Sequence, residues 1–489
     1  MLFLDSCKES IGLGVVGECA DGELCATARY HLLGSGSTDS STQGIVDAKP
    51  GDSGTTTFDS SNITSITATS VPKGWTVDNI DMYKGTITVI SPSTFTNEEV
   101  VSGTIDLKGY TPTGKTKSIS IYVAIVENSV DYSNAPANCY VATNPDTRYI
   151  FDPMVGGSNT ALQTVKVQVI WETTTDLIQY LDLRDGKATF YVAGYKENEE
   201  DENVGVKAGN ALIGGYDAND NLVWSWHVWV TNNNPMAAEN TISLNGATLM
   251  TMNLGAECNS NGSADTKSVF NSYGLYYQWG RKEPFVGPTS YNFTLNEDHA
   301  MTDFEGDEVY MSYVESTDAE GTTSWASENP LSIIKGHKEN GYDWLYNGHD
   351  NSLWSATTKT ENDPCPAGWR VPDASIYESL TIASAYDAMA WEELQPLYGL
   401  MLTDTNTNAE YFFTAQGRRN YLDCRLDIVN DDELCPIPWS GYYWTATAEG
   451  DDATAMFFDL NTATRTWNGF DAHRAMHRAN ALPIRCVKE

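Results

Sequence analysis

The stretch "DPCPAGWRVPD", residues 363–373, is the most restricted segment of a chain that is otherwise polar and rich in β-type sequence. Its prolines fix the backbone φ angle and remove backbone N–H donors, and Gly368 permits a turn. A segment of this kind has little conformational entropy to lose on folding. Its residues therefore raise one question, which is whether the segment is a binding site or a structural brace.

The length of the chain, 489 residues, exceeds what one hydrophobic core supports. At about 100–200 residues per domain, three or four domains are expected, and three is our working number. A content of 41% hydrophobic and 11% aromatic residues supplies enough apolar surface for folding.

The net charge of −37 repels phosphate backbones and anionic lipid surfaces. We therefore expect no nucleic-acid partner. An acidic surface also attracts cations such as Ca²⁺, although charge that only keeps a secreted protein in solution is the simpler interpretation.

The N-terminal segment "MLFLDSCKES" (1–10) places a short apolar stretch before Cys7. It resembles the end of a bacterial lipoprotein signal, with an acidic residue after "CK" as in the surface-export signals of Bacteroidetes lipoproteins. Cys7 would then carry the lipid anchor, and the chain would meet the membrane only through that lipid. The alternative is an ordinary cytosolic start. No run of about 20 apolar residues predicts a spanning helix.

The nine cysteines leave eight if Cys7 is acylated. Two pairs, Cys19/Cys25 and Cys424/Cys435, are close enough in sequence to close short loops. No C-x-x-C pair occurs, which disfavours zinc ribbons and thioredoxin-like chemistry. An oxidising, extracytoplasmic compartment fits this usage better.

The composition divides the N-terminal half into three parts. We expect residues 1–58 to hold the signal remnant, the Cys7 anchor and a flexible tether rich in Gly, Ser, Thr and Asp. Alternating β-branched runs predict an immunoglobulin-like β-sandwich over 59–130, with Trp75 in its core, and a second β-rich domain over 131–243.

The segment "VWSWHVWV" (223–230) predicts a covered strand, because alternation places apolar side chains on both of its faces. His227 is expected to be a core residue. Residues 374–397 carry the best helical pattern of the chain, and a Ser/Ala-rich break near 383–385 leaves two short helices as the alternative to one.

Five segments in order identify the C-terminal half, 244–489, by resemblance. They are "GATLMTMNLGA" (246–256), "GLYYQWGRKEPF" (274–285), "DPCPAGWRVPD" (363–373), "GYYWTATAEG" (441–450) and "ALPIRCVKE" (481–489). Together they resemble the Fibrobacter succinogenes major paralogous domain of Bacteroidetes surface proteins, which is related to the C-type lectin-like fold. The expected fold is mainly β and multidomain, with immunoglobulin-like sandwiches followed by an α+β C-type lectin-like module.

The resemblance implies roles for the quoted residues. A Cys365–Cys486 disulfide would tie the entry of the module to its exit, and closing so long a loop is worth about 4–5 kcal/mol in the chain-entropy model. Trp369 would fill the core, and Arg370 would be a buried or half-buried ion-pair partner. The aromatic residues of "YYQWGRK" (276–282) are expected in the core rather than on a sugar.

The expected ligand surface is the long loop region, 413–444. It holds cations and an aromatic side chain in an otherwise acidic protein, a mixture typical of binding hot spots: Arg418, Arg419, Tyr421 and Arg425. It also holds the candidate Cys424–Cys435 bridge.

Calcium-dependent sugar binding of the C-type lectin kind is not expected, because its loop and strand motifs have only the partial counterparts "ENP" (328–330) and "WNG" (467–469). Clustered carboxylates leave weak Ca²⁺ candidates at Asp431, Asp432, Glu433, Asp451 and Asp452. His473 and His477 have metal-ligand spacing only on a helix, and a loop is expected there. No cofactor is predicted.

No catalytic motif stands out, so we expect a non-enzymatic protein. Carboxylate pairs for glycoside hydrolysis stay open, because their separation is spatial. The sequence favours a lipid-anchored adhesin or fimbrial tip-associated protein of the outer-membrane surface that binds a glycan or a host surface protein, with other fimbrial subunits as further partners. The alternatives are a glycan-capture lipoprotein for polysaccharide utilisation and a structural pilus subunit without its own ligand.

Overall fold

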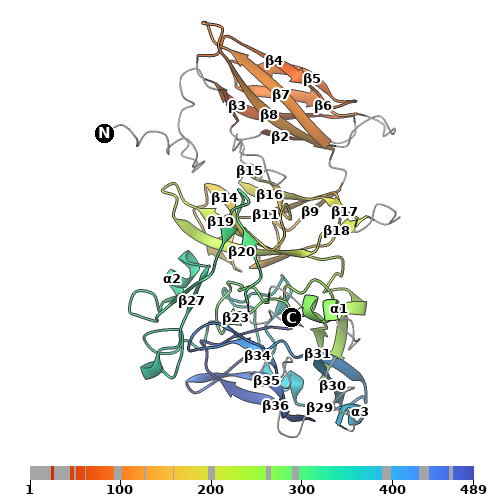
Figure 1. Ribbon diagram of the computed structural model, residues 1–489, viewed down its shortest axis with the longest axis vertical. Helices are drawn as coiled ribbons and strands as arrows, with labels where there is room; N and C mark the ends of the chain where they lie inside the picture. Colours follow the sequence, from red (N-terminus) through yellow and green to blue (C-terminus); the bar gives the residue numbers. More distant parts are fainter. Residues whose placement is uncertain are drawn as a thin grey trace.

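The computed structural model describes residues 24–26, 44–48, 51–60, 62–92, 102–125, 128–157, 159–184, 186–196, 204–259, 266–288, 297–387, 398–428, 440–461 and 466–489. The fold is mainly β, as expected, and its sheets form three tiers along the long axis (Figure 1). Within these residues, no helix is long and apolar enough to cross a membrane.

The first tier, drawn in orange and red at the top of Figure 1, is a sandwich of two four-stranded sheets. One sheet has the order β1 (Leu24–Ala26), β3 (Ser53–Ser60), β6 (Thr86–Ile90), β5 (Thr76–Asp81). The other has the order β2 (Gly44–Ala48), β8 (Thr116–Ile125), β7 (Ser102–Tyr110), β4 (Ser65–Ser70). Alternate side chains of these strands enclose a small core that includes Trp75, as predicted.

The tether expected over residues 1–58 is wrong for its C-terminal part, since β2 and β3 belong to the sandwich. β2 runs parallel to β8, and β3 runs antiparallel to β6. The polar composition concealed this strand. Neighbouring strands satisfy the backbone hydrogen bonds of β3, and among its described side chains Phe58 is the apolar one that enters the core. Cys7 lies outside the described residues.

The second tier contains a six-stranded and a four-stranded sheet that face each other across one core. The six-stranded sheet has the order β10 (Cys139–Ala142), β20 (Leu222–Val230), β19 (Gly209–Tyr216), β14 (Lys166–Glu172), β24 (Met301–Thr302), β25 (Glu308–Val309). The four-stranded sheet has the order β15 (Gln179–Arg184), β16 (Lys187–Val192), β11 (Thr147–Phe151), β9 (Asn128–Asp131). Two short pairs complete the tier: β12 (Val155–Gly156) with β13 (Thr160–Ala161), and β17 (Gly194–Tyr195) with β18 (Gly205–Val206).

Strand β20 is covered on both faces, as predicted. Trp224 and Trp226 enter the core of the second tier, whereas Trp229 points to the opposite side and joins the core of the third tier. His227 is a core residue; burial lowers its pKa to about 3, and its Nε2 lies 2.9 Å from Asn210 Oδ1.

The expected boundary at residue 243 does not separate two cores. Strands β24 and β25 come from the C-terminal half and extend the six-stranded sheet. The largest core joins side chains of β14, β19 and β20 to others from as far along the chain as Cys486. The second and third tiers are therefore one packing unit.

The third tier is built of small sheets. The first has the order β21 (Thr241–Leu244), β22 (Ala247–Met250), β38 (Val487–Lys488), β28 (Trp369–Arg370), and the second β23 (Tyr277–Gln278), β37 (Ala481–Leu482), β32 (Arg418–Arg419), β33 (Leu426–Asp427). A two-stranded sheet pairs β26 (Ser312–Val314) with β27 (Ser332–Ile334). A three-stranded sheet has the order β29 (Leu380–Ile382), β30 (Gly399–Asp404), β31 (Glu410–Thr414). Another has the order β34 (Ser440–Glu449), β35 (Asp452–Asn461), β36 (Thr466–Met476). The described residues also form the helices α1 (Thr266–Asn271), α2 (Thr323–Glu328), α3 (Ser384–Asp387) and the 3₁₀ turns η1 (Ala238–Asn240), η2 (Lys338–Asn340), η3 (Ala374–Tyr377).

The helix expected over residues 374–397 is wrong in its described part, 374–387. Turn η3 leads into β29, which pairs antiparallel with β30, and only α3 is α-helical. Pairing with β30 buries Leu380 in the adjacent core, and this tertiary contact overrides the local helical pattern.

A fully buried charge cluster joins the second and third tiers. Glu283 lies 3.1 Å from Arg281 Nε and 2.8 Å from Lys282 Nζ. Burial opposes ionisation of Glu283, but the two cations outweigh it and hold its pKa below the ordinary value. Lys282 also donates to the side-chain hydroxyl of Ser225 on β20, at 2.9 Å, and its Nζ lies over the Trp224 ring.

The segment 363–373 is a structural brace. Cys365 and Cys486 form a disulfide, as the resemblance implies, and Trp369 lies in the largest core. Asp363, fully buried, accepts hydrogen bonds from the backbone N–H groups of Cys365 and Val371 at 2.9 Å each.

The ionic role expected of Arg370 falls to another residue. Lys359 Nζ lies 2.7 Å from Asp363 and also donates to the carbonyls of Cys365 and Trp369. Arg370 donates to the Val371 carbonyl instead, and it forms no ion pair within the described ranges. Asp363 is therefore occupied by Lys359, and Asp373, the other carboxylate of the segment, accepts from the Ser375 N–H and the Thr447 hydroxyl.

We expect Glu283→Gln to lower the free energy of unfolding by about 3–5 kcal/mol, because it leaves two buried cations without a counter-charge. Chemical denaturation measures the loss. Glu315→Gln is the matched control: Glu315 is 72% exposed in its pair with Lys335, so its loss should stay within about 1 kcal/mol. Equal effects of the two substitutions would contradict the structural role of the cluster.

Removing the disulfide by Cys365→Ser combined with Cys486→Ser should lower stability by up to about 4–5 kcal/mol, because a link across 121 residues restricts the unfolded chain. Urea denaturation checks this. Cys365→Ser alone should lose a similar amount. An unchanged midpoint in both variants would exclude a stabilising role.

Candidate functional site

The four predicted ligand residues have different environments. Arg419 is fully buried and is therefore wrong as a surface contact. Its Nη2 lies 2.7 Å from Asp298 Oδ1, and its other donors reach the carbonyls of Val286 and Cys424. This guanidinium joins three segments of the interior.

Arg418 and Arg425 lie nearer the surface. Arg418 Nε lies 3.1 Å from Asp427 Oδ2 on the paired strand β33, and its guanidinium packs over the Tyr442 ring. Arg425 is exposed, and its backbone N–H donates to Asp423 Oδ1. Neither side chain lies in the aromatic cluster that Tyr421 joins.

The predicted Cys424–Cys435 bridge is wrong, because Cys424 is a free thiol. Its backbone φ is +64°, and its side chain is buried in a core beside Ile333. Burial raises the pKa of the Cys424 thiol to about 12. Cys435 lies outside the described residues.

Tyr421 belongs to a triad of rings drawn from three distant segments. The ring centroids lie 4.9 Å apart for Tyr342 and Tyr421, 4.5 Å for Tyr421 and His477, and 4.9 Å for Tyr342 and His477. The Gly336 N–H donates to the Tyr421 carbonyl at 2.7 Å, and His477 Nδ1 lies 2.7 Å from Asp452 Oδ1. All three rings are partly exposed, so the triad is a fixed aromatic surface.

The backbone holds Tyr342 in an unusual conformation. Its φ is +59°, and its carbonyl accepts from the Ala479 N–H at 3.3 Å. The preceding Gly341, also at positive φ, approaches the β34–β35 turn so closely that an added Cβ would lie 2.6 Å from Asp451 Cβ. A close turn of this kind requires glycine.

A polar rim adjoins the triad. His349 bridges two carboxylates, with Nδ1 2.9 Å from Asp343 and Nε2 3.1 Å from Asp451. Burial raises the pKa of Asp343, against the hydrogen bond from His349 and the nearby charge of Arg478. Arg478 donates to Asn351 Oδ1 at 2.6 Å and packs over the Trp279 ring, so the rim is anchored in the core.

The weak calcium candidates that the structure describes have carboxylates that are paired with histidines. Asp451 and Asp452 pair with His349 and His477. Among the described residues, no three His, Cys, Asp or Glu side chains form a group that could hold a metal ion. Asp431, Asp432 and Glu433 lie outside the described ranges. His473 lies in β36, not in a loop, and pairs with Glu378.

Sequence reasoning found Tyr421 and the two aspartates but missed Tyr342, His349 and the contribution of His477. The only signal was the density of aromatic, Asn, Gly and Asp residues in "ENGYDWLYNGHD" (339–350). The aromatic residues of "YYQWGRK", in contrast, are fully buried, as expected.

Comparison with known proteins assigns the chain to no family. No protein-family model matches the chain, and no curated protein matches it. Solved structures match parts of it, and the three described below have TM-scores of 0.12 to 0.16, so these similarities carry no argument about function.

Three of the matching solved structures come from different classes of protein. An endo-fucoidan hydrolase of glycoside hydrolase family 107 is 11% identical, with 38% of this chain and 32% of that chain covered and a TM-score of 0.16. The D00-D0 domain of intimin is 11% identical over 38% of this chain and 93% of that chain, with a TM-score of 0.15. The Bacteroides ovatus mixed-linkage glucan utilization locus SGBP-B, in complex with a mixed-linkage heptasaccharide, is 13% identical over 38% and 43% of the two chains, with a TM-score of 0.12. The chain spans about a third of the length of the hydrolase.

We expect Arg419→Ala to lower the free energy of unfolding by about 3 kcal/mol or more, because it leaves Asp298 and buried carbonyls without their donor. Arg425→Ala is the matched control and should change stability by about 0.5 kcal/mol or less, since the side chain is exposed. Thermal or urea unfolding of both variants measures the difference. If the free energy of unfolding of the Arg419→Ala variant were unchanged, Arg419 would again be a candidate for ligand binding.

Proposed function

We propose that this chain is a non-enzymatic cell-surface binding protein, an adhesin or fimbrial tip-associated protein, whose C-terminal module binds a glycan. The proposal includes the placement of residues 244–489 with the Fibrobacter succinogenes major paralogous domain and its C-type lectin-like fold, and a lipid anchor at Cys7. The observation that carries the glycan part is the triad of Tyr342, Tyr421 and His477.

The triad suits a sugar for two reasons. Partly exposed rings that already pack on one another offer apolar faces to the C–H surface of a sugar at little entropic cost. The Asp451 carboxylate beside them, held by His349 and still 72% exposed, supplies hydrogen-bond acceptors for hydroxyl groups. A host protein is the second ligand class, and the same surface would serve it.

The negative charge of the polar rim predicts which class of glycan this surface prefers. Asp451 is 72% exposed, and Asp452 lies beside it, in a protein of net charge −37. Like charges across an interface oppose binding. We therefore expect neutral glycans to be preferred to sialylated or sulfated ones.

Tyr421→Ala should weaken binding to the best neutral glycan by about tenfold or more, because it removes a ring from the stacking surface. A panel of neutral, sialylated and sulfated glycans, with host mucins included, measures this on the full chain. Tyr83→Ala is the control, since Tyr83 is 99% exposed in the first tier, away from the triad.

His477→Ala tests the same surface independently and should also weaken binding. If both variants keep their fold and bind like the unmodified chain, the triad is not the ligand site. Binding of mucin protein without any glycan would favour the host-protein class.

A further inference from the structure

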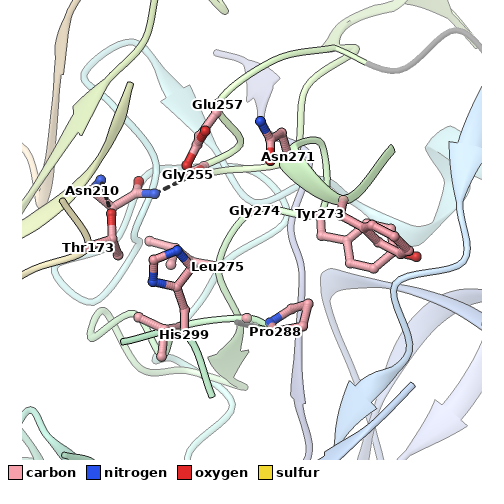
Figure 2. Close-up of a pocket in the computed structure, with 13 residues that line it drawn as sticks. Thr173, Asn210, Gly255, Glu257, Asn271, Tyr273, Gly274, Leu275, Pro288 and His299 are labelled. Atoms are coloured by element: carbon pink, nitrogen blue, oxygen red, sulfur yellow. Dashed lines mark hydrogen bonds between the residues drawn. The ribbon is translucent and has the colours of Figure 1, made fainter. Parts of the chain in front are cut away.

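A cavity of about 100 Å³ lies where the second tier meets the third (Figure 2), and no residue of the aromatic triad lines it. Its walls come from the six-stranded sheet and the adjoining Thr173, from the chain around α1, and from residues 286–288 and His299. Figure 2 shows Glu257 and Asn271 on one side of it and His299 and Pro288 on the other. Glu257, Asn271 and His299 are each partly exposed, so the cavity opens to solvent.

The cavity is rigidly built. Asn210 donates to the Gly255 carbonyl at 2.8 Å and accepts from His227, and its backbone N–H donates to Thr173 Oγ1 at 2.9 Å. Gly274 has a φ of +72°, and a Cβ there would lie 2.6 Å from a backbone carbonyl oxygen. Only glycine permits this close approach, so the wall does not adapt to its contents.

Glu257 is the unusual group in this wall. Its backbone is held by Asn271 and Thr231, at 2.8 Å in each case. Its carboxylate, however, has no hydrogen bond or ion pair in the part of the chain that the structure describes. Burial raises the pKa of Glu257 to about 7, and the charge of Lys267 only partly opposes the shift. A desolvated carboxylate gains free energy from any cation that reaches it.

The other walls are apolar or neutral. Leu275, Val286 and Pro288 supply apolar surface, and none of the described residues that line the cavity is a lysine or arginine. The volume is well below the roughly 300–1,000 Å³ of pockets for drug-sized ligands. A cavity of this size therefore fits the end of an aliphatic chain rather than a ring system. The net charge of −37 also concentrates cations around the protein.

We propose that this cavity binds a primary ammonium group on a short unbranched aliphatic stem. The ammonium pairs with the Glu257 carboxylate and donates to the Asn271 side-chain oxygen, while the stem packs on Leu275 and Val286. Such a group ends a lysine side chain of a partner protein, and it also ends a polyamine. This site is independent of the glycan surface, because it shares no residue with the triad.

The test compares n-butylammonium with its neutral isostere n-butanol on the methyl-labelled full-length chain. Shifts of the Leu275 and Val286 methyl resonances report binding. We expect millimolar affinity for n-butylammonium and a loss of about tenfold or more for n-butanol. Equal affinities, or no shift with n-butylammonium, would overturn the proposal without any variant being needed.

Two variants sharpen the result. Glu257→Gln should weaken n-butylammonium binding by about tenfold or more, whereas Glu305→Gln, at an exposed glutamate, should leave it unchanged. Unchanged binding by Glu257→Gln would overturn the proposal, and its methyl spectrum shows whether it is folded.

Nα-acetyl-lysine methylamide and putrescine then distinguish the sources. Tighter binding of the first assigns a partner's lysine, and tighter binding of the second assigns a polyamine. Binding of neither would overturn the inference.

Discussion

The buried carboxylate of Glu283 is the interaction on which the lower two tiers depend. It pairs with Arg281, which donates to the carbonyls of Ser332 and Ala326 in the third tier, and with Lys282, which reaches β20 in the second. A buried charge is costly unless it is paired and hydrogen-bonded, so all three side chains must be placed together. The Trp229 indole adds a neutral link across the same seam, donating to the Ala256 carbonyl at 2.7 Å.

The brace at residues 363–373 links the same two tiers close to this cluster, because the Trp224 ring under Lys282 donates its N–H to Asn138. Asn138, which precedes β10, donates to the carbonyls of Glu361 and Asp363. The disulfide then fixes the brace to the last strand of the chain. Rigid connections of this kind explain why side chains from residues 342, 421 and 477 meet with their rings in contact. A ligand surface assembled from loops needs a scaffold that does not move.

The two proposed binding surfaces have different physical characters. The triad is an open aromatic face with a carboxylate rim, and its chemistry depends on ring surface. The cavity at Glu257 is small and depends on one desolvated carboxylate. The first lies within the third tier, and the second exists only because the second tier closes over the chain near α1. A truncated C-terminal module would therefore lose part of the wall that Thr173 and Asn210 supply.

The sequence by itself determined the features that follow from local pattern. Strict alternation in residues 223–230 predicted a strand covered on both faces, and proline and glycine in the opening stretch predicted a rigid segment. The buried state of His227 and of the aromatic residues in 276–282 also followed, because a large apolar group without a partner motif belongs in a core. Only the tertiary structure decided which charges are buried and which rings meet. Arg419 and Arg418 are neighbours in sequence, yet opposite faces of one strand make the first an interior ion-pair partner and leave the second partly exposed. Tyr421, His477 and Tyr342 are far apart in the chain, and only long-range packing, which no local pattern encodes, brings them together.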